Sequence, residues 1–300
     1  MTIHVVGNCT IDLILTVERF PAPGETLIAT GLRREIGGKG ANQAVVARRC
    51  GVDVRLIAPL GRDGNGDWAA SELTAEGLDA SSFLRVTVPT DLSLIYVAPD
   101  GENTIVSTAL AADSVTPEQA AGALGGAAGG DWLMMQGNLP LAATQAALAA
   151  ARAAGVRTML NPAPVRWPAS ELWPLCDVAV VNQTEAKAFT STAEPIAALE
   201  RLVAAGARTA VVTLGAEGVR WLSDAGPAAR RAEHVTAIDT TGAGDSFCGT
   251  LCGALAAGAS FPLAIEAATR AAAICVARPG THAAFLTREE AQAIFGDLLR

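Results

Sequence analysis

Positive charge is scarce in this 300-residue chain, which has 22 lysines and arginines against 30 aspartates and glutamates and a formal net charge of −8. Proteins that bind nucleic acid or an anionic membrane through their charge usually carry a basic patch. The sequence contains no cluster of basic residues of that kind. We therefore expect neither nucleic acid nor a membrane surface among the partners.

Cysteine pairs are also missing. None of the six cysteines forms a C-x-x-C pair, and only three histidines are present. Zinc sites normally need such pairs or a matching histidine spacing, so we predict six reduced thiols and no zinc. Lysine occurs only at Lys39 and Lys187, against twenty arginines, which draws attention to Lys39 in a glycine-rich stretch.

No segment has the composition of a membrane span or an export signal. The alanine-rich stretch 249–277 is interrupted by Pro262, Glu266 and Arg270, which a membrane span would exclude. Met1-Thr2 leads directly into the strand-like segment 3–6, without the basic and apolar regions of a signal peptide. We expect a cytoplasmic protein.

The remaining pattern predicts an α/β fold. Half of the residues are hydrophobic and 17% are charged, as in globular proteins. Beyond Pro117, helices and strands are predicted to alternate, which gives a mostly parallel sheet flanked by helices with binding sites at the carboxyl ends of its strands. The predicted helices are 117–128, 141–154 and 194–205, and the predicted strands are 132–136, 158–160, 178–181 and 209–214. The whole chain, 1–300, is expected to form this single domain.

Several extended segments precede that alternation and predict a second, smaller sheet. Segments 13–17 and 26–36 look extended, and 92–97 and 104–107 flank the turn Pro99-Asp100-Gly101 as in a hairpin. We predict a small β-sheet lid built from about 11–36 and 88–109.

Two glycine-rich stretches each precede a predicted helix: 37–44 (GGKGANQA) and 239–247 (DTTGAGDSF), the second after an extended run that ends at Thr240 and Thr241. The first amides of a helix have no partner within it and suit a phosphate. The first stretch is not a Walker A loop, since Arg33 and Gly40 replace the required residues, and neither stretch has the G-x-G-x-x-G pattern of a nicotinamide-dependent oxidoreductase. Asp245 is placed either to take a proton from an attacking hydroxyl or simply to cap the helix.

Polar residues follow three of the predicted strands. Asn138 follows 132–136, Asn182 to Glu185 follow 178–181, and Thr213 to Gly218 close 209–214. Carboxyl ends of parallel strands meet at one edge of a sheet, so these residues are expected to line a nucleotide site together with the 239–247 turn.

These motifs, in this order, resemble those of the ribokinase family of carbohydrate kinases, also called the PfkB family. The stretch 37–44 is similar to its N-terminal signature and 239–247 to its C-terminal signature, with Asn161-Pro162-Ala163-Pro164 and the two nucleotide-side motifs between them. The resemblance spans nearly the whole chain and implies transfer of the γ-phosphoryl group of ATP to a sugar hydroxyl, Mg²⁺ as cofactor, and a homodimer formed through the lid.

The same resemblance assigns residues to roles. It makes Asp245 the catalytic base and the amides of Gly242, Ala243 and Gly244 the anion hole. It places the sugar against Thr10, Asp12, Gly38, Lys39, Asn42, Asn138 and Asp245. It places ATP against Asn182, Glu185, Thr213, Gly215, Glu217, Gly218, Gly244 and Thr269, with Glu185 also ordering water around Mg²⁺.

A potassium site is implied as well, at Asp239, Thr241, Cys275, Arg278 and Gly280, mostly through backbone carbonyls. A further ligand position that is often serine in the family falls on Ala284. Thr10 and Asn138 also differ from the Asn and Glu usual in the ribose-binding branch, so the acceptor stays open between a pentose or related sugar, fructose and a nucleoside. A non-catalytic sugar- or nucleotide-binding regulator is the alternative from another class.

Overall fold

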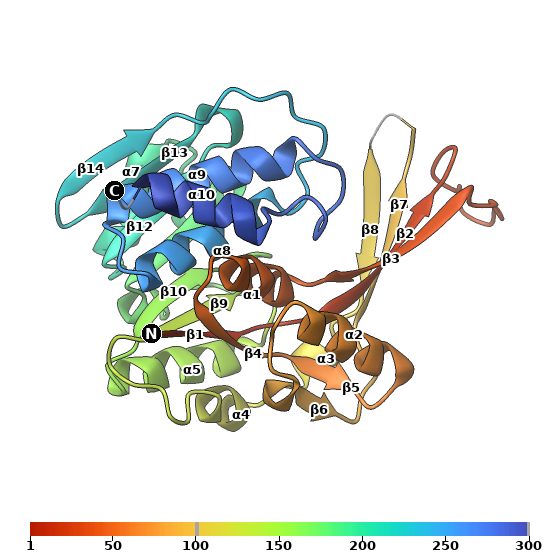
Figure 1. Cartoon of the computed structure of the whole chain (residues 1–300), viewed down its shortest axis with the longest axis horizontal. Helices are drawn as coiled ribbons and strands as arrows, with labels where there is room; N and C mark the ends of the chain where they lie inside the picture. Colours follow the sequence, from red (N-terminus) through yellow and green to blue (C-terminus); the bar gives the residue numbers. More distant parts are fainter. Residues whose placement is uncertain (100–101, 299–300) are drawn as a thin grey trace.

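The computed structural model describes residues 1–99 and 102–298, and its centre is an eight-stranded sheet (Figure 1). The strand order is β14-β13-β12-β11-β10-β9-β1-β4. The strands from β12 to β4 run parallel, whereas β13 and β14 are antiparallel additions at one edge. The strands are β1 (Thr2–Val6), β4 (Asp53–Ile57), β9 (Trp132–Gln136), β10 (Arg157–Asn161), β11 (Val178–Asn182), β12 (Thr209–Thr213), β13 (Val219–Ser223) and β14 (Gly226–Arg230).

Helices cover both faces of this sheet. Apolar side chains of the central strands point into two hydrophobic clusters, and each cluster also contains side chains of the helices on one face. Ile3 and Val5 of β1 belong to one cluster and Val6 to the other. The first cluster includes α1 (Lys39–Arg49), α8 (Ala243–Ala256), α9 (Phe261–Val276) and α10 (Arg288–Leu298), and the second includes α4 (Pro117–Gly122), α5 (Leu141–Ala153), α6 (Gln183–Thr190) and α7 (Pro195–Ala204). The predicted mostly parallel sheet flanked by helices is confirmed.

A separate four-stranded sheet projects from this body (Figure 1). Its order is β3-β2-β7-β8, with β2 parallel to β7 and antiparallel to β3. The strands are β2 (Thr10–Thr16), β3 (Gly31–Gly37), β7 (Leu92–Val97) and β8 (Asn103–Ser107). These strands fall almost entirely within the segments predicted for the lid, although 26–36 becomes a strand only from Gly31. Action as a lid stays a prediction, and Asp100-Gly101 of the predicted turn lie outside the described residues.

Further elements lie between the strands of these two sheets along the chain. β5 (Pro59–Gly61) and β6 (Leu84–Val86) form a third sheet of two parallel strands, and α2 (Gly64–Ala75) and α3 (Leu110–Asp113) are helices. Among the described residues, no helix is both long and apolar enough to cross a membrane. All six cysteines are buried free thiols.

The close packing of α8 on α1 positions the site. A Cβ built on Gly249 of α8 would lie 2.7 Å from the Gln43 carbonyl oxygen and from the Val46 Cβ in α1. Only glycine fits at such a distance, because any side chain would push the two helices apart. The start of α8, which carries Asp245, is thereby held against the first turns of α1.

Two local predictions are wrong. The helix expected over 117–128 ends at Gly122, where several glycines follow and residues 123–126 form turns. The extended run before Thr240 is not a strand, because residues 231–240 have no regular secondary structure and pair with no described strand. Instead the amides of Ile238 and Asp239 donate to the Val276 carbonyl at the end of α9, at 2.7 and 3.2 Å. The hairpin β13–β14, the pair β5–β6 and helix α6 were not predicted.

Candidate active site

The start of α8 is a turn with free backbone donors. Gly242 precedes the helix in the left-handed region, at φ 77°, and a Cβ there would lie 2.8 Å from a ring carbon of Phe285. The amide of Ala243 donates weakly, at 3.3 Å, to the Thr240 carbonyl, and the first strong helical bond joins the Ser246 amide to the Gly242 carbonyl at 2.8 Å. The amides of Gly244 and Asp245 have no partner among the described residues. This turn therefore presents donors and the positive end of a helix dipole to an anion.

In the other glycine-rich turn, the amides of Gly40, Ala41 and Asn42 already have partners. At the start of α1, Asn8 accepts from the amide of Gly40 through its side chain at 3.2 Å and from the amide of Ala41 through its carbonyl at 3.0 Å. The Gly38 carbonyl accepts from the Asn42 amide at 2.9 Å. The two turns, which look alike in sequence, therefore differ, and α8 offers the better anion site.

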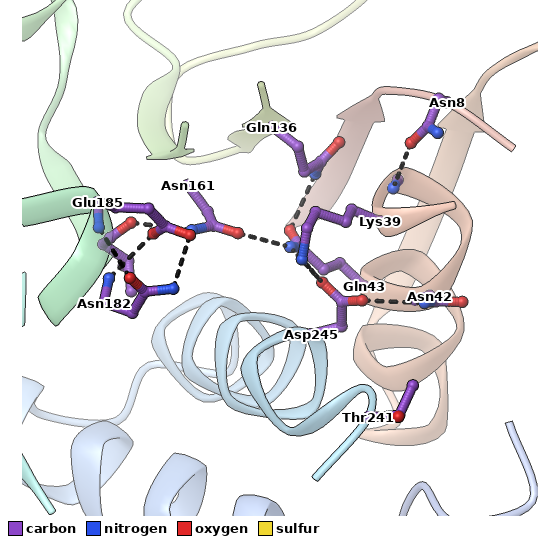
Figure 2. A network of polar contacts seen from close by, with 12 residues as sticks. Asn8, Lys39, Asn42, Gln43, Gln136, Asn161, Asn182, Glu185, Thr241 and Asp245 are labelled. Carbon is purple, nitrogen blue, oxygen red and sulfur yellow. Dashed lines mark hydrogen bonds and ion pairs between the residues drawn. The ribbon is translucent and has the colours of Figure 1, made fainter. Parts of the chain in front are cut away.

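Asp245 is buried, with 4% of its surface exposed, and receives donors from α1 at both carboxylate oxygens (Figure 2). Asn42 Nδ2 donates to Oδ2 at 2.9 Å and Gln43 Nε2 to Oδ1 at 3.0 Å. Lys39 Nζ lies 3.5 Å from Oδ1. The negative charge of Asp245 raises the pKa of Lys39, against the opposing effect of burial, so the lysine stays protonated.

The polar residues at the end of β11 form a reciprocal cap on α6. Asn182 Oδ1 accepts from the Glu185 amide at 2.9 Å, and Glu185 accepts from the backbone and side-chain nitrogens of Asn182 at 2.9 and 2.8 Å. This is the capping-box arrangement. Burial raises the pKa of Glu185, although the bond from Asn182 and the charge of Lys39 oppose that shift.

A small cavity of about 50 Å³ lies between these two groups of residues. Its walls come from α1, the end of β10 and the residues just after it, the ends of β11 and β12, α6 and the start of α8. Its lining includes Lys39, Asn182, Glu185, Thr213, Gly244 and Cys248. Predicted residues from both signatures and from the three intermediate motifs therefore meet at one edge of the sheet.

Four of the residues expected at ATP do not line this cavity. Gly215 and Glu217 lie in the short 3-10 turn Gly215–Glu217 just beyond β12, and Gly218 follows it. Thr269 is buried in α9 and its hydroxyl donates to the Ile265 carbonyl of the same helix at 2.8 Å. Roles for these residues toward a nucleotide stay predictions.

On the sugar side, Asp12 and Thr10 stand at the start of β2. Thr10 Oγ1 donates to Asp12 Oδ1 at 2.8 Å, and a Cβ on Gly37 would lie 2.1 Å from the same carboxylate. Burial raises the pKa of Asp12, and the charges of Glu35 and Asp245 add to that shift. Hydrogen bonds from Thr10 and Ser93 oppose this rise in the pKa of Asp12 but do not outweigh it.

Asn138 follows β9, and Arg166 fixes its backbone. The Arg166 guanidinium donates to the Asn138 carbonyl and forms bonds of 2.8 and 3.1 Å to Asp113. Asn138 Oδ1 is buried and has no donor. A buried carbonyl oxygen without a partner is costly unless a ligand supplies one.

The predicted cation residues come together beside α8. Asp239 Oδ1 accepts from the Thr241 amide at 2.9 Å and Oδ2 from the Gly280 amide at 3.0 Å, and Cys275 Sγ lies 3.5 Å from the Thr241 carbonyl. Burial opposes a low pKa for Asp239, but these bonds outweigh it and lower that pKa. Arg278 instead pairs with Glu290. The described residues contain no cluster of three or more His, Cys, Asp or Glu side chains suited to a metal.

Several buried residues next to the site were given no role by the sequence. Gln43, Gln136 and Asn161 form a buried amide chain that reaches Asp245 (Figure 2). His282 Nε2 bonds to Asn42 Oδ1 at 3.0 Å, and burial lowers the pKa of His282 to about 4. The imidazole is therefore neutral, and it donates to Asn42 while Asn42 donates to Asp245.

Comparison with known proteins decides the family, because residues 2–288 match the model of the pfkB family carbohydrate kinases. The chain belongs to this family. It is 35% identical over 297 residues to the ribokinase of Haemophilus influenzae, and the match covers 96% of each chain.

Solved structures agree with this membership. The ribokinase of Thermotoga maritima superposes with a TM-score of 0.90 at 30% identity, covering 98% of this chain and 99% of that one. The Arabidopsis thaliana ribokinase complexed with ribose and ATP superposes with a TM-score of 0.89 at 26% identity, covering 97% of each. The kinase fold predicted from the two signatures is confirmed.

Proposed function

We propose that this protein is an ATP-dependent sugar kinase, which moves the γ-phosphoryl group of ATP to a hydroxyl of a pentose or a related sugar. The observation that carries the proposal is the position of Asp245. Its buried carboxylate stands at the start of α8, beside unpaired amides and 3.5 Å from Lys39. Membership of a carbohydrate kinase family and the likeness to ribokinases support the same reaction.

Phosphoryl transfer needs positioning and charge neutralisation more than covalent chemistry. In the proposed reaction Asp245 accepts the proton of the attacking hydroxyl, which becomes more acidic as its oxygen bonds to phosphorus. The amides of Gly242, Ala243 and Gly244, together with that of Asp245, donate to the transferred group, and Lys39 adds a positive charge on the same side. The proton then resides on Asp245 and leaves with the product sugar phosphate or through solvent.

ATP is proposed to lie along the sheet edge formed by β11 and β12. Asn182, Glu185, Thr213 and Gly244 line the cavity there, which supports this placement. Mg²⁺ fits the site through Glu185, because Mg²⁺ usually binds through phosphates, waters and one or two carboxylates rather than through a protein cage. When bound, Mg²⁺ neutralises charge on the phosphates.

The sugar is proposed to lie between β2 and the start of α1, against Asp12, Lys39, Asn42 and Asp245. The buried Oδ1 of Asn138 has no donor in the described structure, and a sugar hydroxyl would supply one. We further propose that potassium binds the loop around Asp239, chiefly through backbone carbonyls. Its remaining position falls on Ala284, which is buried and has no hydroxyl.

The lid is proposed to pair with the lid of a second copy. Several of its large hydrophobic side chains are exposed, namely Ile28 at 81%, Leu32 at 67%, Ile105 at 52% and Val106 at 62%. An apolar patch of this kind often marks an interface. We also propose that the protein acts in the cytoplasm, where ATP is available and thiols stay reduced.

A coupled assay of ADP formation tests the proposed function. Purified protein with ATP, Mg²⁺ and K⁺ is given D-ribose, 2-deoxy-D-ribose, D-fructose or a nucleoside, and each reaction is compared with ATP alone. We expect ADP release to depend on a pentose, with a phosphorylated sugar detected by mass spectrometry. Absence of phosphorylated product with every acceptor, despite measurable ATP binding, would favour a non-catalytic binding protein.

A further inference from the structure

Gln43 is fully buried in the second turn of α1, although glutamine is a residue that normally stays at the surface. Both the nitrogen and the oxygen of its carboxamide have hydrogen-bond partners. Nε2 donates to Asp245 Oδ1 at 3.0 Å and to Asn161 Oδ1 at 3.2 Å, while Oε1 accepts from Gln136 Nε2 at 2.9 Å (Figure 2). All three partners lie on other elements of the fold.

These three bonds leave one orientation for the amide. Turning it by half a revolution would direct Oε1 at two oxygen acceptors and Nε2 at the donor of Gln136. The carboxylate of Asp245 accepts hydrogen bonds only, so it also requires the amide nitrogen of Gln43 on its side. The donor that faces Oδ1 is therefore fixed before any substrate arrives.

We propose that Gln43 is a positioning residue for the catalytic base, because it fixes the rotation of the Asp245 carboxylate. One carboxylate oxygen is then presented to the sugar hydroxyl while the bonds from Asn42 and Gln43 are kept. This inference rests on the proposed kinase function. Asn42 holds Oδ2 and Gln43 holds Oδ1, so the carboxylate plane is determined from two sides. Through Asn161, which lines the nucleotide-side cavity, Gln43 also ties the base to the wall of that cavity.

A purely structural role makes a different prediction. If Gln43 only satisfied buried polar groups, its loss would lower stability and leave turnover per folded molecule unchanged. Gln136 provides the comparison, since it is also buried, with 1% exposed, and also belongs to the amide chain, but it does not touch Asp245.

The first test compares Gln43→Leu with Gln136→Leu in the full-length protein. Both remove a buried amide, so both are expected to lower the melting temperature by a similar amount. Gln43→Leu should lower kcat by about 10- to 100-fold, as expected for loss of one hydrogen bond to a charged group, with the KM for ATP within about threefold of the wild type. Gln136→Leu should keep kcat within about fivefold.

The second test is the pH profile of Gln43→Glu. When protonated, the introduced carboxyl can still donate to Asp245 Oδ1, but when ionised it repels that carboxylate. We expect kcat of this variant to fall as pH rises through the pKa of the introduced carboxyl, which the neighbouring charge raises above its usual value of about 4.3. The wild type and Gln43→Leu should lack this loss.

Three kinetic results overturn the proposal: kcat of Gln43→Leu within about threefold of the wild type, an equal loss of kcat in Gln136→Leu, or a pH profile of Gln43→Glu parallel to that of the wild type. A crystal structure of Gln43→Leu gives a readout that needs no turnover. The carboxylate plane of Asp245 should rotate or become disordered there, and an unchanged plane also overturns the proposal. Failure of the wild type to phosphorylate any sugar instead refutes the proposed function.

Discussion

Glu185 has two separable tasks in this account, as part of the cap on α6 and as the carboxylate that orders water around Mg²⁺. Glu185→Ala removes the two bonds that the Glu185 carboxylate accepts from Asn182, while the bond from the residue 185 amide to Asn182 Oδ1 can remain. Loss of such a cap costs about 1–2 kcal/mol. In a domain of this size that corresponds to a fall in melting temperature of about 2–6 °C.

Glu185→Gln is the matched control. Glutamine can also occupy this position of a capping box, because its one oxygen still accepts from the Asn182 amide. Asn182 is exposed, so water replaces the lost side-chain bond. We expect the melting temperature of Glu185→Gln to stay within about 1 °C of the wild type, in keeping with a change below about 0.5 kcal/mol.

Catalytic activity, unlike stability, should be lower in both variants than in the wild type. Removing the carboxylate should lower kcat, or raise the Mg²⁺ concentration for half-maximal activity, by about 10- to 100-fold in both variants, as for residues that support a metal through water. Thermal unfolding and Mg²⁺ titrations of kcat measure the two effects. A wild-type Mg²⁺ dependence in Glu185→Gln, or a loss of stability as large as that of Glu185→Ala, would refute the two tasks assigned to Glu185.

The pH dependence of this pair follows from the raised pKa of Glu185, which burial causes. A raised carboxyl pKa means that folding favours the protonated form, so this group destabilises the wild type as pH rises from about 4.5 through its folded pKa. Glu185→Gln lacks this charge. Its unfolding free energy relative to the wild type should therefore decrease as pH is lowered through that window, and a difference independent of pH would refute the assignment.

Three further predictions concern charge, the cation and the lid. Lys39→Met should lower kcat/KM for ATP by about 10²- to 10³-fold, since it removes the positive charge beside Asp245, and steady-state kinetics within fivefold of the wild type would contradict this. Replacing K⁺ by tetramethylammonium should lower kcat, whereas equal activity in both dismisses the cation loop around Asp239. Leu32→Ser combined with Val106→Ser should convert a dimer to a monomer in light scattering, and an unchanged mass would exclude the lid as the interface.

Much of this site can be predicted from the sequence, because its residues lie next to glycines. Lys39, Asn42 and Asp245 all lie in short glycine-rich stretches at helix starts, where backbone donors converge on a ligand. Sequence alone could not show which of the two turns has free amides. That difference depends on Asn8, which caps α1 from a segment 32 residues away.

The residues whose roles the sequence did not predict contact partners that are far away along the chain. Gln43 reads as one polar residue within a helix, and its role appears only when Asp245, 202 positions later, is packed against it. His282 likewise bonds to Asn42 across 240 positions. The error over 231–240 has a related origin, since its β-branched residues favour a strand but no neighbouring strand is available to pair with it.

The central claim is that Asp245 acts as the base of phosphoryl transfer, and Asp245→Asn tests it most directly. The variant keeps the size of the side chain but introduces an amide between the donors of Asn42 and Gln43. A single-turnover experiment with γ-labelled ATP and the best sugar measures the rate of phosphoryl transfer. Calorimetry measures ATP affinity separately. We predict a fall in the transfer rate of about 10²- to 10⁴-fold with ATP affinity within about threefold of the wild type. Transfer at a near-normal rate would contradict the account.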